Sequence, residues 1–244
     1  MELIKVKFNE IKNSDNPDLI NDFLIELSEN PSKEHLGYLN HFIESTDAQI
    51  LNKIKLNLMY LLGEIGNLTP LPDDFLKLIV KEYYKSDRWI RNEIIQAISK
   101  ISKKSELNEK AVELLSTALI DEYIPIKIST LKLLLNFKNL PDKLLTNLIR
   151  IMNSDDSEIL EGCRRIFERF PQQSERIFRM LNINENYKNL KSRGIRSLLL
   201  IQFKSIMNVE SFREMIVNSK WDEISREKYL KELDTFERIL LKNM

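Results

Sequence analysis

The sequence predicts an all-α fold, an α-solenoid in which pairs of helices repeat along the chain. Three observations lead to this prediction. The 244 residues include only five Gly and seven Pro, which supply too few turns for a multi-stranded sheet. Apolar residues recur with the 3.6-residue period of a helix, and the whole pattern returns every 31–36 residues. At ordinary helix and loop lengths the chain is expected to hold about 11–13 helices.

Five segments, which we term the B helices, define the repeat. Each carries apolar residues at most of the offsets 0, 4, 5, 8 and 11, and these offsets place the residues on one face of a helix. Cys163, Arg164 and Gly194 are among the exceptions. The segments begin at Ile54, Ile90, Ile126, Ile159 and Leu190.

Helical patterns also lie between the B helices, and we term these the A helices. They cover roughly residues 73–85, 108–120, 141–153 and 173–181. Pro72, Pro141 and Pro171 stand at the start of three of them, where a missing N–H costs nothing. Each repeat is therefore helix A, a turn and helix B. A single hairpin cannot bury its own apolar faces, whereas a stack of hairpins can.

The two ends of the chain read as caps of one continuous solenoid, which divides into residues 1–45, 46–205 and 206–244. Residues 2–45 suggest three helices, with Asp15 or Asn16 and then Ser32 as N-caps. Asp222 caps a long last helix that either folds on the last repeat or serves a partner or dimer, because part of its spacing resembles a coiled coil. The apolar residues of this helix are Ile224, Tyr229, Leu233, Phe236 and Leu240.

Two short motifs resemble those of HEAT-repeat proteins. Residues 62–66, Leu-Gly-Glu-Ile-Gly, precede a proline-bearing turn like the end of a HEAT repeat. Residues 87–91, Asp-Arg-Trp-Ile-Arg, resemble the start of its second helix, and residues 156–159 echo them. The resemblance covers about residues 46–203. It implies a right-handed superhelix with B helices along its concave surface, and Gly63 and Gly66 are expected to be turn glycines.

Composition excludes several classes of protein. The single cysteine, Cys163, rules out an intramolecular disulfide and a multi-cysteine zinc site. No run of about 18 apolar residues predicts a membrane span, and the acidic start without a signal-peptide core predicts a cytoplasmic protein. Charge is uneven: residues 1–126 hold 15 basic and 21 acidic side chains, and residues 127–213 hold 16 and 9. The second stretch could therefore offer a basic face to an anionic partner.

Catalytic motifs are absent, so we predict a protein that is no enzyme and has no metal or cofactor. His35 and His41 are six residues apart and share no helix face, and Cys163 falls in the core column without a histidine nearby. The sequence has no Gly-rich phosphate loop, no Cys-x-x-Cys and no His-Glu-x-x-His. Two enzymatic alternatives remain by resemblance, a chromophore lyase and a HEAT-like alkylpurine DNA glycosylase. The latter would use Trp89 with Asp87, or Trp221 with Asp222.

The side of the B helices opposite the core holds the candidate partner-binding residues. None of the residues equivalent to Trp89 is large and apolar, so its side chain is expected to face solvent. The flank of the same helices carries Lys55, Arg91, Lys127 and Lys191, which are expected to pair with acidic residues of neighbouring repeats. The candidate site consists of Trp89, Gln96, Lys100, Lys132, Arg165, Arg169 and Arg196.

These features predict a scaffold or adaptor that binds a protein partner through the B helices. Nucleic-acid binding through the same basic residues is the alternative, and ordinary solvated charge is the third interpretation. The sequence leaves the partner's identity and the oligomeric state open.

Overall fold

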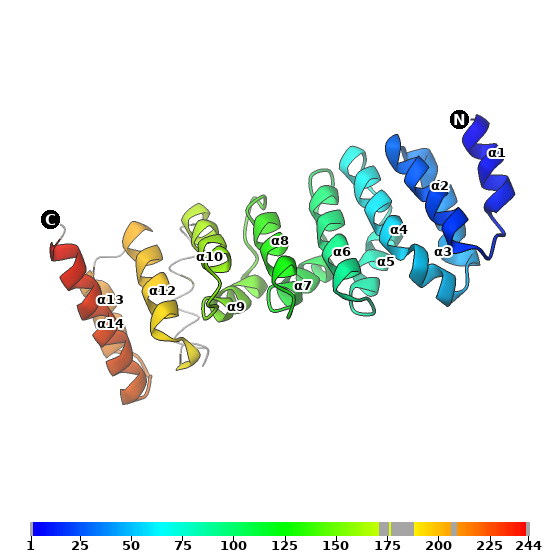
Figure 1. The fold of residues 1–244 in the computed structure, drawn as a ribbon. Coiled ribbons are helices and arrows are strands. Elements are labelled where there is room, and N and C mark those ends of the chain that lie inside the picture. The colour runs from blue at the N-terminus through cyan, green and yellow to red at the C-terminus, as the bar shows by residue number, and fades with distance from the viewer. Residues whose placement is uncertain (1, 171–175, 177–187, 206–208, 243–244) are drawn as a thin grey trace. The chain divides into compact units, whose positions relative to one another are not determined.

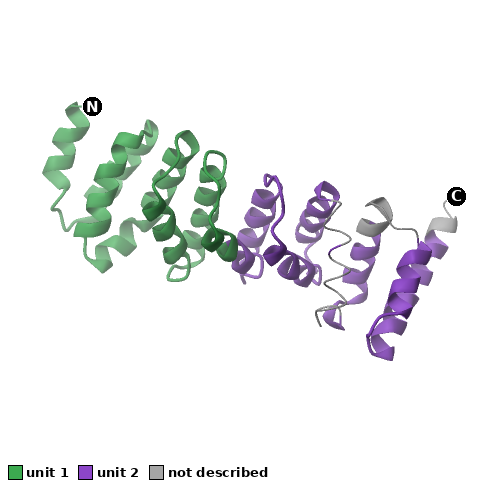
Figure 2. Ribbon diagram, turned by 180° about the vertical axis from the view of Figure 1, so that it is seen from behind, with its two compact units in different colours: residues 1–114 green, residues 115–244 purple. Residues whose placement is uncertain are grey.

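The computed structural model describes residues 2–170, 176, 188–205 and 209–242, and over these residues the chain is all-α and forms helical repeats (Figure 1). Thirteen α-helices lie in this described part, within the expected range. Chain contacts divide the molecule into two compact units, residues 1–114 and 115–244 (Figure 2). We describe each unit by itself.

Unit 1 is built from helical hairpins whose even-numbered helices pack side by side. Helix α4 lies between α2 and α6, and the odd-numbered helices pack along the other side of this row (Figure 1). The elements that begin in this unit are α1 (Glu2–Ile11), α2 (Pro17–Glu29), the 3₁₀ helix η1 (Lys33–His35), α3 (Leu36–Ser45), α4 (Ala48–Leu68), α5 (Asp73–Tyr83), α6 (Arg88–Ile101) and α7 (Glu109–Ala118).

Helix α2 belongs to the same row as the B helices α4 and α6. The Asn57 side chain donates a hydrogen bond of 2.8 Å to Asn21 Oδ1, exactly one 36-residue step earlier in the chain. Ile20, Phe23, Leu24 and Leu27 bury the inner face of α2. The expected three helices of residues 2–45 are therefore present, and the second of them extends the row of stacked helices.

Aspartates start many of the even-numbered helices, and they explain the Asp-x-x-apolar motif. Asp87 accepts hydrogen bonds from the backbone N–H groups of Trp89 and Ile90 at 2.8 and 3.1 Å. Asp156 does the same for Glu158 and Ile159 at 2.8 and 3.1 Å. The side chain satisfies N–H groups that have no helical partner, and the apolar residue three positions later starts the core face.

The expectation that Gly63 and Gly66 are turn glycines is wrong. Both are buried within α4, against α6. A Cβ on Gly63 would lie 2.8 Å from the Ala97 Cα, and one on Gly66 would lie 2.4 Å from a side-chain carbon of Ile101. These glycines are needed because the two helices approach so closely that a side chain would collide with the neighbouring helix.

Unit 2 continues the same architecture. Helix α10 packs between α8 and α12, and α14 packs against α12 and α13. The unit contains α8 (Ile124–Leu134), α9 (Asp142–Ile151), α10 (Ser157–Arg169), α12 (Ser192–Ser205), α13 (Val209–Val217) and α14 (Glu223–Lys242). The A helix expected at 173–181 and Pro171 lie outside the described residues, apart from Arg176, which is helical.

The last helix folds back on its own unit. Tyr229 and Leu233 are fully buried, and the Trp221 ring packs on Tyr229 with centroids 4.7 Å apart. Arg213 of α13 contacts Asp234 at 2.8 Å and Glu237 at 2.7 Å. The apolar stripe with coiled-coil-like spacing is therefore used, at these two positions, to pack α14 within unit 2.

Candidate functional site: the even-helix face

The even-helix face is the surface formed, in each unit, by the side chains of even-numbered helices that point away from the core. In unit 1 it carries three exposed large apolar side chains on two adjacent helices. Trp89 of α6 is 58% exposed, and Leu56 and Tyr60 of α4 are 44% and 40% exposed. Trp89 is in the first turn of α6, whose start is fixed by Asp87. The predicted solvent exposure of Trp89 is confirmed.

Lys100 and Gln96 accompany Trp89 on α6. Lys100 reaches back one repeat to α4, where its Nζ lies 2.7 Å from Glu64 and 4.4 Å from the centre of the Tyr60 ring. Gln96 is half-buried. The cation of Lys100 is therefore held against α4, which leaves the aromatic and aliphatic side chains as the more accessible features of this part of the face.

Leu56 and Tyr60 complete the apolar part of the face, although the sequence argument did not select them. Their positions one repeat later are Asn92 and Gln96, which are polar. Comparison along the repeat therefore gave no apolar column. The signal that would have found them is local: both stand four residues apart on the outer side of α4.

The basic residues of unit 2 lie on three even-numbered helices, and three of the four pair with glutamate. Lys132 of α8 contacts Glu158 at 3.1 Å, and Arg165 of α10 contacts Glu161 at 3.0 Å. Arg196 of α12 contacts Glu232 of α14 at 2.6 Å. Arg169 is exposed, and its guanidinium lies 5.7 Å from the Phe170 ring centre.

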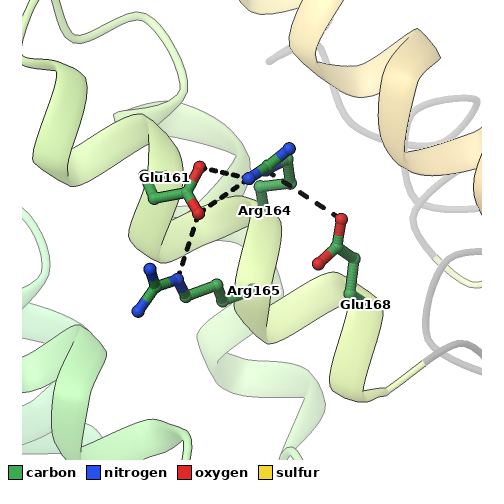
Figure 3. Close-up of polar contacts among 4 residues, drawn as sticks. All are labelled: Glu161, Arg164, Arg165 and Glu168. Carbon is green, nitrogen blue, oxygen red and sulfur yellow. Dashed lines mark hydrogen bonds and ion pairs between the residues drawn. The ribbon is translucent and has the colours of Figure 1, made fainter.

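A cluster on α10 shows how charge is balanced on this face (Figure 3). Glu161 accepts hydrogen bonds from Arg164 at 2.7 Å and from Arg165 at 3.0 Å. These two hydrogen bonds lower the pKa of the Glu161 carboxyl. Glu168 lies 3.9 Å from Arg164 on the next turn. The face here is a mixture of both charges, and a uniform basic stripe does not describe it.

A pocket of about 160 Å³ opens between α8 and α10 in unit 2. Two of the predicted site residues, Lys132 and Arg165, are on its wall together with Glu158 and Glu161. The remaining lining residues are Ile128, Leu131, Leu135 and Gly162. The structure therefore brings predicted cations from two repeats to one apolar depression, which the sequence did not reveal.

The flanking basic column has the structural role that the sequence predicted at the positions with described partners. Lys55 makes a buried ion pair with Glu82 at 2.7 Å. Arg91 donates to the Ser86 carbonyl oxygen at 3.2 Å, and Lys191 lies 3.9 Å from Asp155. Only Lys55 and Lys191 reach an acid through these contacts. The column ties the even-numbered helices to neighbouring segments, and we leave it out of the candidate site.

The residues of the enzymatic alternatives occupy structural positions. Trp221 is 6% exposed and packs on Tyr229, and Asp222 caps α14 by accepting from the Ser225 N–H at 2.9 Å. Cys163 is buried, and burial raises the pKa of its thiol well above the ordinary value. Within the described residues, no group of three or more His, Cys, Asp and Glu side chains could hold a metal ion. Nor is any described helix both long and apolar enough to cross a membrane.

Solved structures with a similar fold are engineered repeat-like proteins. The crystal structure of one engineered protein superposes with a TM-score of 0.52 at 15% identity, covering 96% of this chain and 98% of that one. A second engineered protein gives 0.51 at 14% identity, covering 95% and 68%. A designed armadillo repeat protein in complex with the peptide (KR)4 gives 0.49 at 14% identity, covering 97% and 100%. The chain is a helical-repeat protein.

At these identities the likeness concerns the fold alone. The sequence matches no protein-family model, and no curated protein matches it. The function of the even-helix face is therefore argued from its own side chains.

Proposed function

We propose that this chain is a non-catalytic cytoplasmic scaffold or adaptor of the HEAT-repeat type, which binds a protein partner through its even-helix face. The observation that carries the proposal is the exposure of Trp89, at 58%, beside the exposed Tyr60 and Leu56. Large aromatic side chains supply much of the free energy at protein interfaces, and a folded chain gains little by leaving them in water.

The charged residues of the face suit steering and orientation of a protein. Lys132, Arg165 and Arg196 each have a glutamate within 3.1 Å. Paired cations offer a polyanion such as DNA less net attraction than unpaired ones. A surface that carries both signs beside an apolar anchor favours a protein partner over a nucleic acid. Nucleic-acid binding is therefore retained as an outcome of the test.

The test compares two tyrosine- or tryptophan-sized side chains of equal exposure on different faces. Trp89 and Tyr84 are both 58% exposed, but Tyr84 follows the odd-numbered helix α5. Affinity capture from native lysate, with and without nuclease, would use the wild type, Trp89→Ala and Tyr84→Ala. We expect a nuclease-resistant protein that Trp89→Ala loses and Tyr84→Ala retains.

Charge reversal supplies the second arm. The variant Lys132→Glu/Arg165→Glu/Arg196→Glu is expected to weaken the same complex, mainly through slower association. Capture of RNA or DNA that nuclease or modest salt abolishes would support the nucleic-acid alternative. Unchanged partners in both Trp89→Ala and the triple variant would refute the even-helix face as the binding surface.

A further inference from the structure

The pocket between α8 and α10 combines an apolar floor with a charged rim. Ile128, Leu131 and Leu135 of α8 form the floor, and all belong to one unit. Its volume of about 160 Å³ is close to that of an engineered cavity of ~150 Å³ that accepts benzene. A pocket of this size therefore fits one leucine or phenylalanine side chain.

The pocket exists because α8 and α10 meet differently from α4 and α6. Gly63 and Ala97 let α4 and α6 approach closely. The equivalent positions on α8 and α10 hold Leu135 and Ile166, whose side chains prevent so close an approach. Gly162, facing Leu131, adds no side chain that would fill the space between them.

The rim charges are accessible and weakly held. Lys132 and Glu158 are 70% and 58% exposed in their side chains, and Arg165 is 63% exposed. Exposed ion pairs contribute little to stability, so a carboxylate from a ligand can replace Glu158 or Glu161 at small cost. Residues 127–213 carry 16 basic and 9 acidic side chains, which favours an acidic ligand over a basic one.

We propose that this pocket binds a protein segment in which one phenylalanine or leucine is flanked by aspartate or glutamate residues. The apolar side chain enters between Ile128 and Leu135, and the flanking carboxylates contact Lys132 and Arg165. Arg169, one turn beyond Arg165 on α10, extends the cationic edge for a further acidic residue. This inference rests on the proposed function, because it specifies the partner chemistry of part of the even-helix face.

The test uses fluorescein-labelled peptides and the full-length protein. The probe is a nine-residue peptide with a central Phe and two Asp or Glu residues on each side, and anisotropy reports its binding. Replacing Phe by Ala should weaken binding at least tenfold, and exchanging the acids for Lys should abolish it. Equal binding of the Phe and Ala peptides would overturn the proposal, since only the charged rim would then matter.

Protein variants assign the binding to the pocket. Ile128→Trp fills the floor and Lys132→Glu reverses the rim, and each should weaken the probe at least tenfold. Lys138→Glu is the matched control, because Lys138 is exposed and does not line the pocket. Should Ile128→Trp fail to fold by circular dichroism, Gly162→Ala replaces it, since its Cβ would stand 2.9 Å from Leu131 Cδ1 and displace that side chain.

Other occupants have distinct signatures that would overturn the assignment. Self-association in sedimentation that Ile128→Trp removes, without peptide binding, would give the pocket to a second copy of the chain. An oligonucleotide that binds through Lys132 while the peptide does not would give the rim to nucleic acid. The probe should bind Trp89→Ala normally, because Trp89 is in unit 1. If lysate capture depends on Trp89 while the probe fails to bind, the inference fails and the proposed function stands.

Discussion

Lys55 and Glu82 form an ion pair that is almost withdrawn from water. Their side chains are 5% and 11% exposed, with Nζ and the carboxylate oxygen 2.7 Å apart. Lys55 also donates to Asn52 Oδ1 at 2.8 Å, so its ammonium group has two partners. The pair joins α4 to α5, and each charge is tolerated there only because the other is present.

Removing one charge of this pair should destabilise the protein strongly. Lys55→Met leaves Glu82 buried without its partner, and we expect a loss of about 3–5 kcal/mol in the free energy of unfolding. Urea unfolding followed by circular dichroism measures it. The control is Lys53→Met, an exposed lysine on the same helix, with an expected change within about 0.5 kcal/mol. Equal effects of the two variants would show that burial of the pair does not matter.

Glu93 presents the opposite case, a carboxyl whose neutral form is favoured. Its Oε1 is buried and has no hydrogen-bond partner in the described structure. Burial raises the pKa of Glu93, and the nearby Glu64 adds to the rise while Lys100 opposes it. A group whose pKa is raised on folding contributes stability below its unfolded pKa, and that contribution is lost as pH rises through the folded pKa.

Glu93→Gln should therefore stabilise the protein in a pH-dependent way. At about pH 7.5 the wild type must keep a partly buried charge, and we expect the variant to gain about 1 kcal/mol. At about pH 4 wild-type Glu93 is protonated, and the gain should shrink toward zero. Urea unfolding at both pH values measures the difference. A gain that grows on acidification would contradict the raised pKa.

At the scale of helix pairs, the distance between α4 and α6 depends on a residue without a side chain. A Cβ on Gly63 would meet the Ala97 Cα at 2.8 Å, and a backbone atom cannot turn aside as a side-chain end can. We expect Gly63→Ala to lose about 1–3 kcal/mol, despite the intrinsic helix preference of alanine of about 1 kcal/mol. Thermal unfolding measures the loss.

Gly37 is the matched control for this substitution. It lies in α3, and an added Cβ there would meet nothing within 4 Å. Gly37→Ala should raise stability by about 0.4–1 kcal/mol, because it restricts the unfolded chain without a collision. If Gly63→Ala is as stabilising as Gly37→Ala, the helices adjust freely and the close contact is not a constraint.

The comparison of these elements shows which information is local in the sequence. Helix starts were predictable because Asp87 and Asp156 cap the N–H groups of the next three residues. The role of Gly63 was not, because it depends on the partner helix. Helix α2 escaped the repeat pattern since its buried residues stand at other offsets, 0, 3, 4 and 7 from Ile20. Position along one helix can be read from sequence, whereas contact between helices needs the fold.

The candidate site divides in the same way. The outward direction of Trp89, Lys132 and Arg165 followed from helical geometry alone. Their glutamate partners did not, because pairing depends on neighbouring helices and side-chain rotamers. Lys100 with Glu64 and Arg196 with Glu232 are each separated by 36 residues, one step of the repeat. The pocket needed both the gap between two helices and the residues that line it.

Across the whole molecule, stability should be distributed along the stack of helices. Each helix of a repeat array packs mainly on its neighbours, so a local defect weakens adjacent hairpins more than distant ones. The contacts here form two compact units, and α14 packs only on elements of unit 2 among its main contacts. Loss of a core residue in α14 should therefore be felt in unit 2 first.

Tyr229→Ala tests this expectation, because Tyr229 is fully buried in α14 and packs on Trp221. Truncating a large buried aromatic costs about 3–5 kcal/mol, so amide hydrogen exchange should accelerate in α12, α13 and α14. Exchange in α2 and α4 should stay as in the wild type. Ile224→Ala, at a side chain that is 80% exposed on the same helix, should change neither region. Equal acceleration in all helices would instead show that the two units unfold as one cooperative structure, with long-range coupling that nearest-neighbour stacking does not provide.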